Sequence, residues 1–339
     1  MKYTAKDIAK ILNVSPATIS LAINNKPGIS MEKRKQILKK IQELGQDDMI
    51  AHQGDPEPVN IGFLVFQRLD IIAEQPYYTY ILENMYEEAA NYNFKVHFLK
   101  ENYRSDIDGL CENLEQNNCK GLVVFATEMS DSDVDFLSEL NLPIIYLDNS
   151  LSTKRVDSIS IDNWQGVRTA IGYLAGLGHE RIGYLKSSTQ INSFNERYQA
   201  YQQSLVELGL PYEEKYTVKV DYGELKAYHA MNSYLAAGNK LPTAFIADND
   251  LLAASAIEAL ATHGYRIPEE ISVMGFDNRP LCTRIAPELT TIKVFKRSFL
   301  QLAFRCLMER IENKRDYTLK IKVGTQLIER GSVGKCNNN

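Results

Sequence analysis

From Ile61 onward, short apolar runs alternate with longer amphipathic stretches, and this alternation constrains the fold more than any other feature. The runs have the length and composition of strands, and the stretches carry apolar residues at helical spacing. Repeated strand–helix units predict parallel strands with helices on both faces of the sheet. The units are too many for one small sheet, so we expect two similar lobes with a cleft between them. Expected strands are 61–66, 95–99, 121–126, 143–147, 158–161, 182–185, 217–220, 243–247, 272–276, 289–292 and 319–323; expected helices are 78–92, 107–116, 131–140, 163–177, 196–208, 225–237, 250–263 and 296–312.

Residues 1–45 follow a different pattern, which predicts three short helices. Thr4 with Asp7 three residues later resembles a capping box. Ser15 is expected to cap the second helix, with Pro16 at its first position. The third helix should end at Gly45. Because a tight turn separates the first two helices, the segment is predicted to be a helix-turn-helix.

The charge distribution separates this head from the rest of the chain. Residues 1–45 hold nine Lys and Arg against three Asp and Glu, a net charge of +6, whereas the remaining residues carry −11. Such asymmetry is expected when one small domain contacts nucleic acid, although a solvated helical surface would look the same. Residues 46–60 contain four acidic residues and no Lys or Arg, and glycine and prolines interrupt them, which predicts a linker.

Composition excludes several classes of protein. The longest apolar runs are too short to cross a bilayer, and the N-terminus does not resemble a signal peptide, so a cytoplasmic protein is expected. The five cysteines contain no CxxC pair, which argues against a disulfide framework or a zinc ribbon. No HExxH, GxSxG or phosphate-loop motif is present, so no metal site, no cofactor and no catalytic residue are predicted.

Several stretches, in the expected order over nearly the whole chain, resemble the lac-repressor (LacI/GalR) family of bacterial transcription regulators. Each motif alone is weak, and their ordered spacing carries the resemblance. The matching stretches are Asp7–Ala9, Val14–Ser20, Ala22–Asn24, Ile161–Asn163 with Gly166, Leu177–His179 with Arg181 and Ile182, Pro242–Phe245, Asn249 with Asp250, Ile267–Asn278 and Leu289–Thr291.

The resemblance implies an α/β body like a periplasmic sugar-binding protein, with two Rossmann-like lobes joined by three crossing strands. The first lobe would comprise about 61–161 and 293–320. The second would comprise about 162–291 and 321–332, and a tail of 333–339 would follow. An effector would close the lobes and change the spacing between two DNA-binding heads. The resemblance thus implies a homodimer on a palindromic double-stranded operator.

In a helix-turn-helix the second helix lies in the major groove. By family position, the residues that face base edges are Pro16, Ala17 and Leu21. These apolar side chains cannot donate hydrogen bonds to bases, but they can pack against thymine methyl groups. For Leu21 the alternative is that its side chain lies in the core of the head and does not face the groove. The remaining DNA contacts, to phosphates, are expected from polar residues near the helix: Thr4, Ser15, Thr18, Ser20 and Asn24.

The segment behind the head departs from the family pattern. Members usually have a hinge helix of Ala-Arg-Xaa-Leu type, whose leucine enters the minor groove. The equivalent span, 47–54, has neither arginine nor leucine, and its acidic residues should be repelled by phosphate. We therefore expect a weakly helical or reorganised hinge; Met49 or Ile50 as an apolar wedge is the alternative.

Ligand sites in open α/β lobes lie at the carboxyl ends of strands, and several polar residues occupy such positions. Family position adds Arg197 as a contact for effector hydroxyls or a carboxylate. Asp250 is as well placed to cap the following helix as to bind an effector, so it is not included among the effector-binding residues. Trp164 could line the cleft or be buried at the lobe interface. The expected effector-binding residues are Tyr77, Tyr78, Asp148, Arg197, Tyr222, Asn249 and Asp277.

The sequence thus predicts a DNA-binding transcription regulator that represses rather than activates. Its effector is predicted to be a small molecule, a sugar or sugar derivative. The missing hinge signature keeps an alternative open, a small-molecule sensor with weakened or lost DNA binding. A sugar-processing enzyme is the third hypothesis, and the sequence supports it least.

Overall fold

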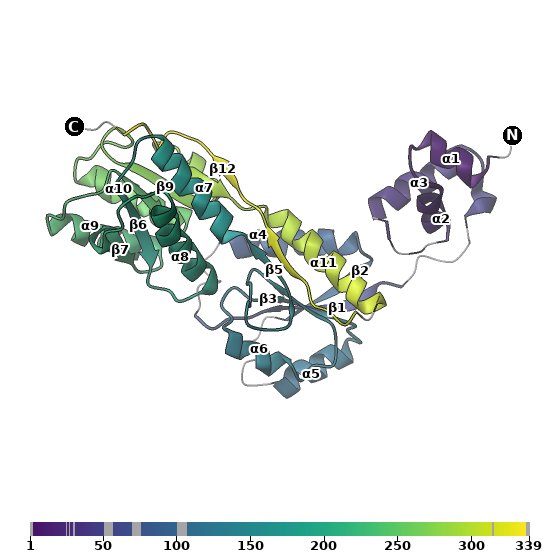
Figure 1. Ribbon diagram of the computed structural model, residues 1–339. Coiled ribbons are helices and arrows are strands. Elements are labelled where there is room, and N and C mark those ends of the chain that lie inside the picture. Colours follow the sequence, from purple (N-terminus) through teal and green to yellow (C-terminus); the bar gives the residue numbers. More distant parts are fainter. Residues whose placement is uncertain are drawn as a thin grey trace.

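A computed structural model describes residues 3–24, 26, 28–29, 31–50, 57–69, 76–99, 107–313 and 315–336, with backbone alone at 31, 32, 76–80 and 82. It contains a three-helix head and a two-lobed body (Figure 1). This is the predicted fold class. Among the described helices, none has both the length and the apolar character that a membrane crossing needs.

The head consists of α1 (Ala5–Ile11), α2 (Pro16–Ile23) and α3 (Met31–Glu43). Thr4 and Asp7 form the predicted capping box, and the Ser15 side chain caps α2. Asn13, with φ 51°, makes the turn between the two helices. Four isoleucines with no exposed surface form the core: Ile8, Ile19, Ile37 and Ile41.

The segment after α3 is a short 3-10 turn, η1 (Asp47–Met49), rather than the start of a linker. Met49 and Ile50 pack against the head core, and Gln46 is buried. These two apolar side chains therefore cover their own domain in this arrangement, which does not favour the wedge alternative. The rest of the expected hinge, residues 51–54, lies outside the described residues.

The first lobe is a parallel sheet of six strands in the order β11-β5-β4-β3-β1-β2. Alternate residues of each strand face opposite sides: Phe63 packs with α4 and α11, and Leu64 packs with α5 and α6. The strands are β1 (Val59–Val65), β2 (Phe94–Leu99), β3 (Leu122–Phe125), β4 (Ile144–Leu147), β5 (Asp157–Ile161) and β11 (Lys320–Val323); the helices are α4 (Pro76–Ala90), α5 (Ile107–Gln116), α6 (Asp131–Leu137) and α11 (Lys296–Glu312).

The second lobe repeats this plan in the order β12-β10-β9-β8-β6-β7, so β4 corresponds to β9 and β3 to β8. Helices α7 and α8 contribute to one core, and α9 and α10 to the other. The strands are β6 (Ile182–Ser187), β7 (Thr217–Val220), β8 (Ala244–Ala247), β9 (Ser272–Asp277), β10 (Thr290–Lys293) and β12 (Gln326–Ile328); the helices are α7 (Asn163–Gly176), α8 (Asn192–Glu207), α9 (Glu224–Ala236) and α10 (Asp250–Thr262), with 3-10 turns η4 (Glu214–Tyr216) and η5 (Pro280–Thr283).

Three boundaries differ from the prediction. β11 pairs with β5 in the first sheet, so the first lobe extends to Val323. The chain was predicted to pass into the second lobe at about residue 321, which is too early. β12, a short antiparallel edge strand, was not predicted. The expected tail is in part a packed element: Val333 is buried, and the Cys336 N–H donates to the Leu177 carbonyl (2.9 Å).

Candidate functional site

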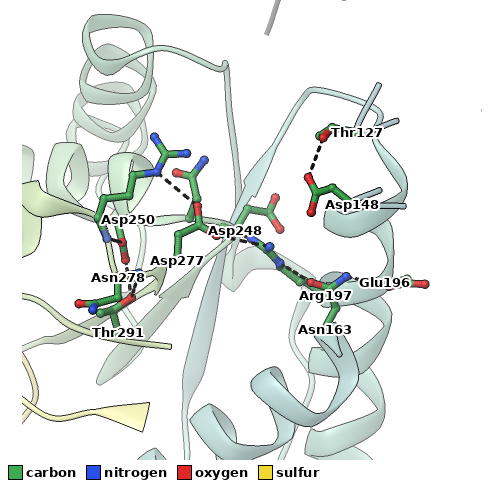
Figure 2. Close-up of polar contacts among 12 residues, drawn as sticks. Thr127, Asp148, Asn163, Glu196, Arg197, Asp248, Asp250, Asp277, Asn278 and Thr291 are labelled. Atoms are coloured by element: carbon green, nitrogen blue, oxygen red, sulfur yellow. Dashed lines mark hydrogen bonds and ion pairs between the residues drawn. The ribbon is translucent and has the colours of Figure 1, made fainter. Parts of the chain in front are cut away.

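Arg197, on α8, is the centre of a buried polar cluster at the carboxyl ends of the second-lobe strands (Figure 2). Its Nε donates to Asn163 Oδ1 (2.8 Å), and one terminal nitrogen donates to the Asp248 carbonyl. The guanidinium carbon lies 3.7 Å from the centroid of the Phe276 ring. These contacts fix the side chain, which is 3% exposed, so its orientation does not depend on a ligand.

Asp277, the last residue of β9, lies between two arginines. Its Oδ1 is 3.5 Å from a terminal nitrogen of Arg197, and its Oδ2 accepts from Arg279 Nε (3.3 Å). The residue has φ 110°, a conformation that few non-glycine residues adopt. The neighbouring arginines offset the cost of placing this carboxylate in a mostly buried position.

Asp148 faces this cluster from the first lobe (Figure 2). It follows β4, has φ 68°, and accepts a hydrogen bond from Thr127 Oγ1 on Oδ2 (2.6 Å). Its Oδ1 is buried and has no hydrogen-bond partner among the described residues. Burial raises the pKa of Asp148 to about 7, against the opposing effects of Thr127 and Arg197. Within the described part of the chain, one carboxylate oxygen is therefore left for a further hydrogen-bond donor.

The predicted residues Asp148, Arg197, Asn249 and Asp277 line one cavity between the lobes. Its volume is about 30 Å³, room for a water molecule and far below the roughly 300 Å³ of small-molecule sites. The other lining residues are Thr127, Ile161, Ile191, Ser193, Phe194 and Arg279.

Asn249, not Asp250, caps α10. Its Oδ1 accepts from the Leu252 N–H (3.0 Å), whereas its buried Nδ2 has no hydrogen-bond partner in the described chain. Asp250 is the first residue of the helix, and its carboxylate accepts from Thr291 Oγ1 and from the Arg279 N–H. The suggestion that Asp250 caps the helix is therefore wrong.

The three predicted tyrosines have different outcomes. Tyr222 is buried beside the cavity rather than lining it, with its ring stacked on Phe194 (centroids 6.4 Å apart). Burial raises the pKa of its hydroxyl, against the effect of nearby Arg279. Tyr77 and Tyr78 lie in the first turn of α4, and their side chains are outside what the structure describes. Trp164, half-buried, packs against the core at the second position of α7.

Sequence reasoning missed two groups of this site. Arg279, which is 3% exposed, follows Asp277 by two residues and could have been included as its counter-charge. Phe194 lies three residues before Arg197 on the same helix, so the two share a face. It was missed because α8 begins at Asn192, four residues before the predicted start; the polar run 192–195 resembled a loop.

On the head, the predicted DNA-contacting residues lie on or beside α2. Ser15, Pro16, Ala17 and Ser20 are exposed, whereas Thr18 and Leu21 are half-buried. The side chains of the other two predicted residues, Asn24 and Thr4, make hydrogen bonds within the head. The Asn24 amide donates to the Ser20 carbonyl (2.9 Å), and Thr4 Oγ1 donates to Asp7 Oδ2 (2.6 Å). The exposed residues of α2 and its caps thus combine apolar Pro16 and Ala17 with polar Ser15, Ser20 and Asn24.

Comparisons with known proteins agree with both parts of this architecture. Residues 4–46 match the model of bacterial regulatory proteins of the lacI family, and residues 171–333 match a periplasmic binding protein-like domain. The chain belongs to the lacI family. The HTH-type transcriptional repressor PurR of Mannheimia succiniciproducens is 29% identical over 338 residues, covering 98% of this chain and 99% of the relative. The probable HTH-type transcriptional repressor ExuR of Bacillus subtilis is 27% identical over 340 residues, covering 97% and 98%.

Solved structures of lacI-family regulators share the fold over most or nearly all of the chain. The regulator CelR in complex with cellobiose has a TM-score of 0.71 at 22% identity, covering 98% of this chain and all of the other. The lac repressor dimer bound to operator and the anti-inducer ONPF has a TM-score of 0.70 at 21% identity, with the same coverage. A family regulator from Enterococcus faecium with bound ribose has a TM-score of 0.67 at 20% identity, covering 82% and 100%. The predicted class, a DNA-binding transcription regulator with a ligand-binding body and not an enzyme, is confirmed.

Proposed function

We propose that this lacI-family protein is a repressor that binds a palindromic operator as a homodimer in the cytoplasm. Its affinity for DNA would be controlled by a polyhydroxylated effector, a sugar or sugar derivative, bound between the lobes. The observation that carries the proposal is the buried Arg197–Asp277 pair, which faces the carboxylate of Asp148 across the cleft.

The unpaired polar atoms of the cleft support this effector class. Among the described residues, Asp148 Oδ1 has no donor, and Asn249 Nδ2, which lies beside the Tyr222 hydroxyl, has no acceptor with hydrogen-bond geometry. A hydroxyl group can serve as either, so a polyol satisfies both atoms without burying a new charge. The stacked rings of Phe194 and Tyr222 add an apolar surface beside these groups. Cellobiose and ribose are bound by structural neighbours of the same fold.

The exposed face of α2 supports the mode of DNA binding. Pro16 and Ala17 offer methyl and methylene groups to thymine, and Ser15 and Ser20 offer hydroxyls to phosphate. Ser15 Oγ also accepts from the Thr18 N–H (3.1 Å), which holds the start of the helix. We expect Ser15→Ala or Thr18→Ala to weaken binding on every sequence, and Ala17→Arg or Leu21→Arg to change the preferred sequence.

Two measurements test the proposal. Binding of the full chain to the promoter beside its own gene, followed by fluorescence anisotropy at several salt concentrations, should be sequence-specific and fall steeply with salt. Weak binding that is equal on unrelated DNA would instead favour the sensor without an operator. A thermal-shift panel of sugars, including cellobiose and ribose, sugar phosphates and nucleobases should raise the melting temperature with a sugar. A response confined to nucleobases would refute the effector class.

A further inference from the structure

Another buried carboxylate lies behind Arg197, at the carboxyl end of β8. Asp248 directly follows that strand and has no exposed surface. Its Oδ1 accepts from the Tyr184 hydroxyl (2.6 Å), and its Oδ2 accepts from the Ser187 N–H (2.6 Å). The Asp248 N–H also donates to the Leu185 carbonyl (3.0 Å). We call Tyr184, Ser187 and Asp248 the carboxylate anchor, because they tie the end of β8 to β6.

The aspartate of this anchor is costly to bury. Burial raises the pKa of Asp248 to about 7, against the effects of its two donors and of Arg197. Tyr184 has no exposed surface either, and its ring packs on Tyr201 with centroids 4.8 Å apart. Apolar residues of similar volume would fill the same space without this cost. A buried carboxylate of this kind, next to a binding surface, is therefore a candidate for a role in that site.

The anchor connects directly to the arginine of the proposed effector site. The Asp248 carbonyl accepts from a terminal nitrogen of Arg197, as Figure 2 shows. Side chain and carbonyl belong to one residue, so the hydrogen bonds at the carboxylate fix the peptide that holds the guanidinium. The next residue, Asn249, caps α10 and lines the cavity. A change at the carboxylate is thus transmitted to Arg197 and Asn249 through the backbone.

The same carboxylate fixes the start of the loop that leads into α8. Ser187, the last residue of β6, donates its N–H to Asp248, and its Oγ accepts from the Thr189 N–H (3.1 Å). Ile191 and Phe194 follow in the chain and line the cavity. The loop after β6 and the loop after β8 therefore both begin at the anchor.

The first lobe has a contact of the same kind at the equivalent position. Glu128, which has no exposed surface, lies just after β3, and its Oε2 accepts from the N–H groups of Arg68 (2.6 Å) and Leu69. Arg68 and Leu69 follow β1, and the strand orders relate β3 to β8 and β1 to β6. In both lobes a buried carboxylate thus holds the loop after the neighbouring strand. This repetition indicates a role at the carboxyl ends of the sheets, where ligands bind.

We propose that Asp248 and Tyr184 are positioning residues of the effector site, which hold Arg197 and the two loops in the geometry that binds without touching the effector. The proposal rests on the proposed function for the role of Arg197 as an effector contact. The orientation of Arg197 itself can be measured without an effector.

Removal of one donor tests the anchor. Tyr184→Phe leaves the ring in place and takes away the hydrogen bond to Asp248 Oδ1, so Arg197 should become more mobile. The readout is the Nε–H signal of Arg197 in the proton–nitrogen NMR spectrum of the full chain, identified by its absence from the spectrum of Arg197→Lys. Exchange of this proton with water should accelerate about tenfold in Tyr184→Phe, since a hydrogen bond to a charged group corresponds to roughly that factor.

Tyr201→Phe is the matched control. Tyr201 packs on Tyr184, is equally buried and lies on the same helix as Arg197, but its hydroxyl donates to the Ile182 carbonyl (2.8 Å). This variant should lose similar stability in urea denaturation and keep the wild-type Arg197 signal. Equal acceleration in both variants would mean that the core has softened as a whole, and would overturn the proposal. An unchanged signal in Tyr184→Phe would overturn it as well.

Two variants of Asp248 separate hydrogen bonding from charge. Asp248→Ala removes both accepted hydrogen bonds, and exchange at Arg197 should accelerate on the order of 100-fold. Asp248→Asn has the shape of the aspartate: its oxygen can accept from the Ser187 N–H, and its amide can donate to the Tyr184 oxygen. It should therefore restore most of the wild-type signal. An asparagine variant as fast as Asp248→Ala would contradict positioning by hydrogen bonds, and Tyr184→Phe decides the question if Asp248→Ala does not fold.

Titration with ribose and cellobiose, followed by the fluorescence of Trp164, the one tryptophan of the chain, extends the test to binding. A sugar that binds the wild type should bind Tyr184→Phe about tenfold more weakly and Tyr201→Phe equally well. Equal affinities for the wild type and Tyr184→Phe would refute the positioning role. If neither sugar binds the wild type, that result weighs against the proposed effector class, and the NMR comparison still decides whether the anchor orients Arg197.

Discussion

The two lobes have the same strand order but contribute differently to the cleft. At the end of β9, the second lobe holds Asp277 between two buried arginines. At the equivalent end of β4, the first lobe holds Asp148, whose one hydrogen-bond partner among the described residues is the Thr127 hydroxyl. Both aspartates have positive φ, 68° and 110°, but their surroundings differ. The second-lobe half of the proposed site is thus fixed by its own ion pairs, whereas Asp148, the described first-lobe carboxylate, has one oxygen without a described partner.

Arg197→Ala should have the largest effect on this comparison, because it removes one of the two arginines that pair with Asp277 and the donor to the Asp248 carbonyl. We expect the free energy of unfolding to fall by about 4 kcal/mol, measured by urea denaturation followed by circular dichroism. Arg168→Ala is the control: this exposed arginine on α7 pairs with Glu207 at the surface and should change stability by less than about 1 kcal/mol. Equal losses in the two variants would mean that the second-lobe cluster is not a buried, fixed unit.

Asp277→Asn should destabilise the protein by about 3 kcal/mol at neutral pH, since it removes the carboxylate that both buried arginines contact. Asparagine tolerates positive φ, so backbone strain does not contribute. Urea denaturation gives the difference directly. A stability equal to that of the wild type would contradict the assignment of Asp277 as the anion that both arginines require.

Asp148→Asn is the same substitution at the equivalent first-lobe position, and it should stabilise the protein rather than destabilise it. The pKa of Asp148 is about 7 in the folded chain against 3.8 as the reference. Between these values the folded protein holds a proton that the unfolded chain lacks, so the contribution of Asp148 to stability is lost as pH rises toward 7. Between pH 5 and pH 8, the free energy of unfolding of the Asp148→Asn variant should therefore rise relative to that of the wild type. At pH 8 the difference should be about 2 kcal/mol. A loss at pH 8 would show that the ionised carboxylate is well compensated.

Thr127→Val should have the smallest effect, a loss of about 1 kcal/mol at pH 8, because Asp148 loses its one described hydrogen bond. The melting temperature of the single variants and of the double variant with Asp148→Asn would measure the coupling. If the effects of the two substitutions on stability add, Thr127 does not act through Asp148.

Much of the fold followed from the sequence because its periodicity is local. The predicted bounds of β7, α5 and α11 are those observed, since each has clear apolar spacing within its own residues. β12 was missed because three antiparallel edge residues carry too little pattern. The assignment of β11 to the first sheet depends on pairing with β5, more than 150 residues earlier, and no local pattern encodes it.

The site was predictable where a polar residue directly follows a strand, as at Asp148, Asn249 and Asp277. It was not predictable where the partner is remote. Asp248, buried and bonded to Tyr184 and the Ser187 N–H, depends on the neighbouring strand β6. The contact of Ser150 with Glu196 depends on how the lobes are oriented, which no run of residues specifies.

The pairing of β11 and β12 has a consequence for biosynthesis. Each adds an edge strand to one of the two sheets, and only Gly324 and Thr325 separate them in the chain. Domains generally fold as they emerge from the ribosome, N-terminal domain first. Here neither sheet can be completed until residues 320–328 have been translated, although most strands of the first lobe precede residue 162. A prematurely terminated chain would therefore carry a complete DNA-binding head on two unfinished lobes and be exposed to proteolysis, which limits the accumulation of unregulated fragments.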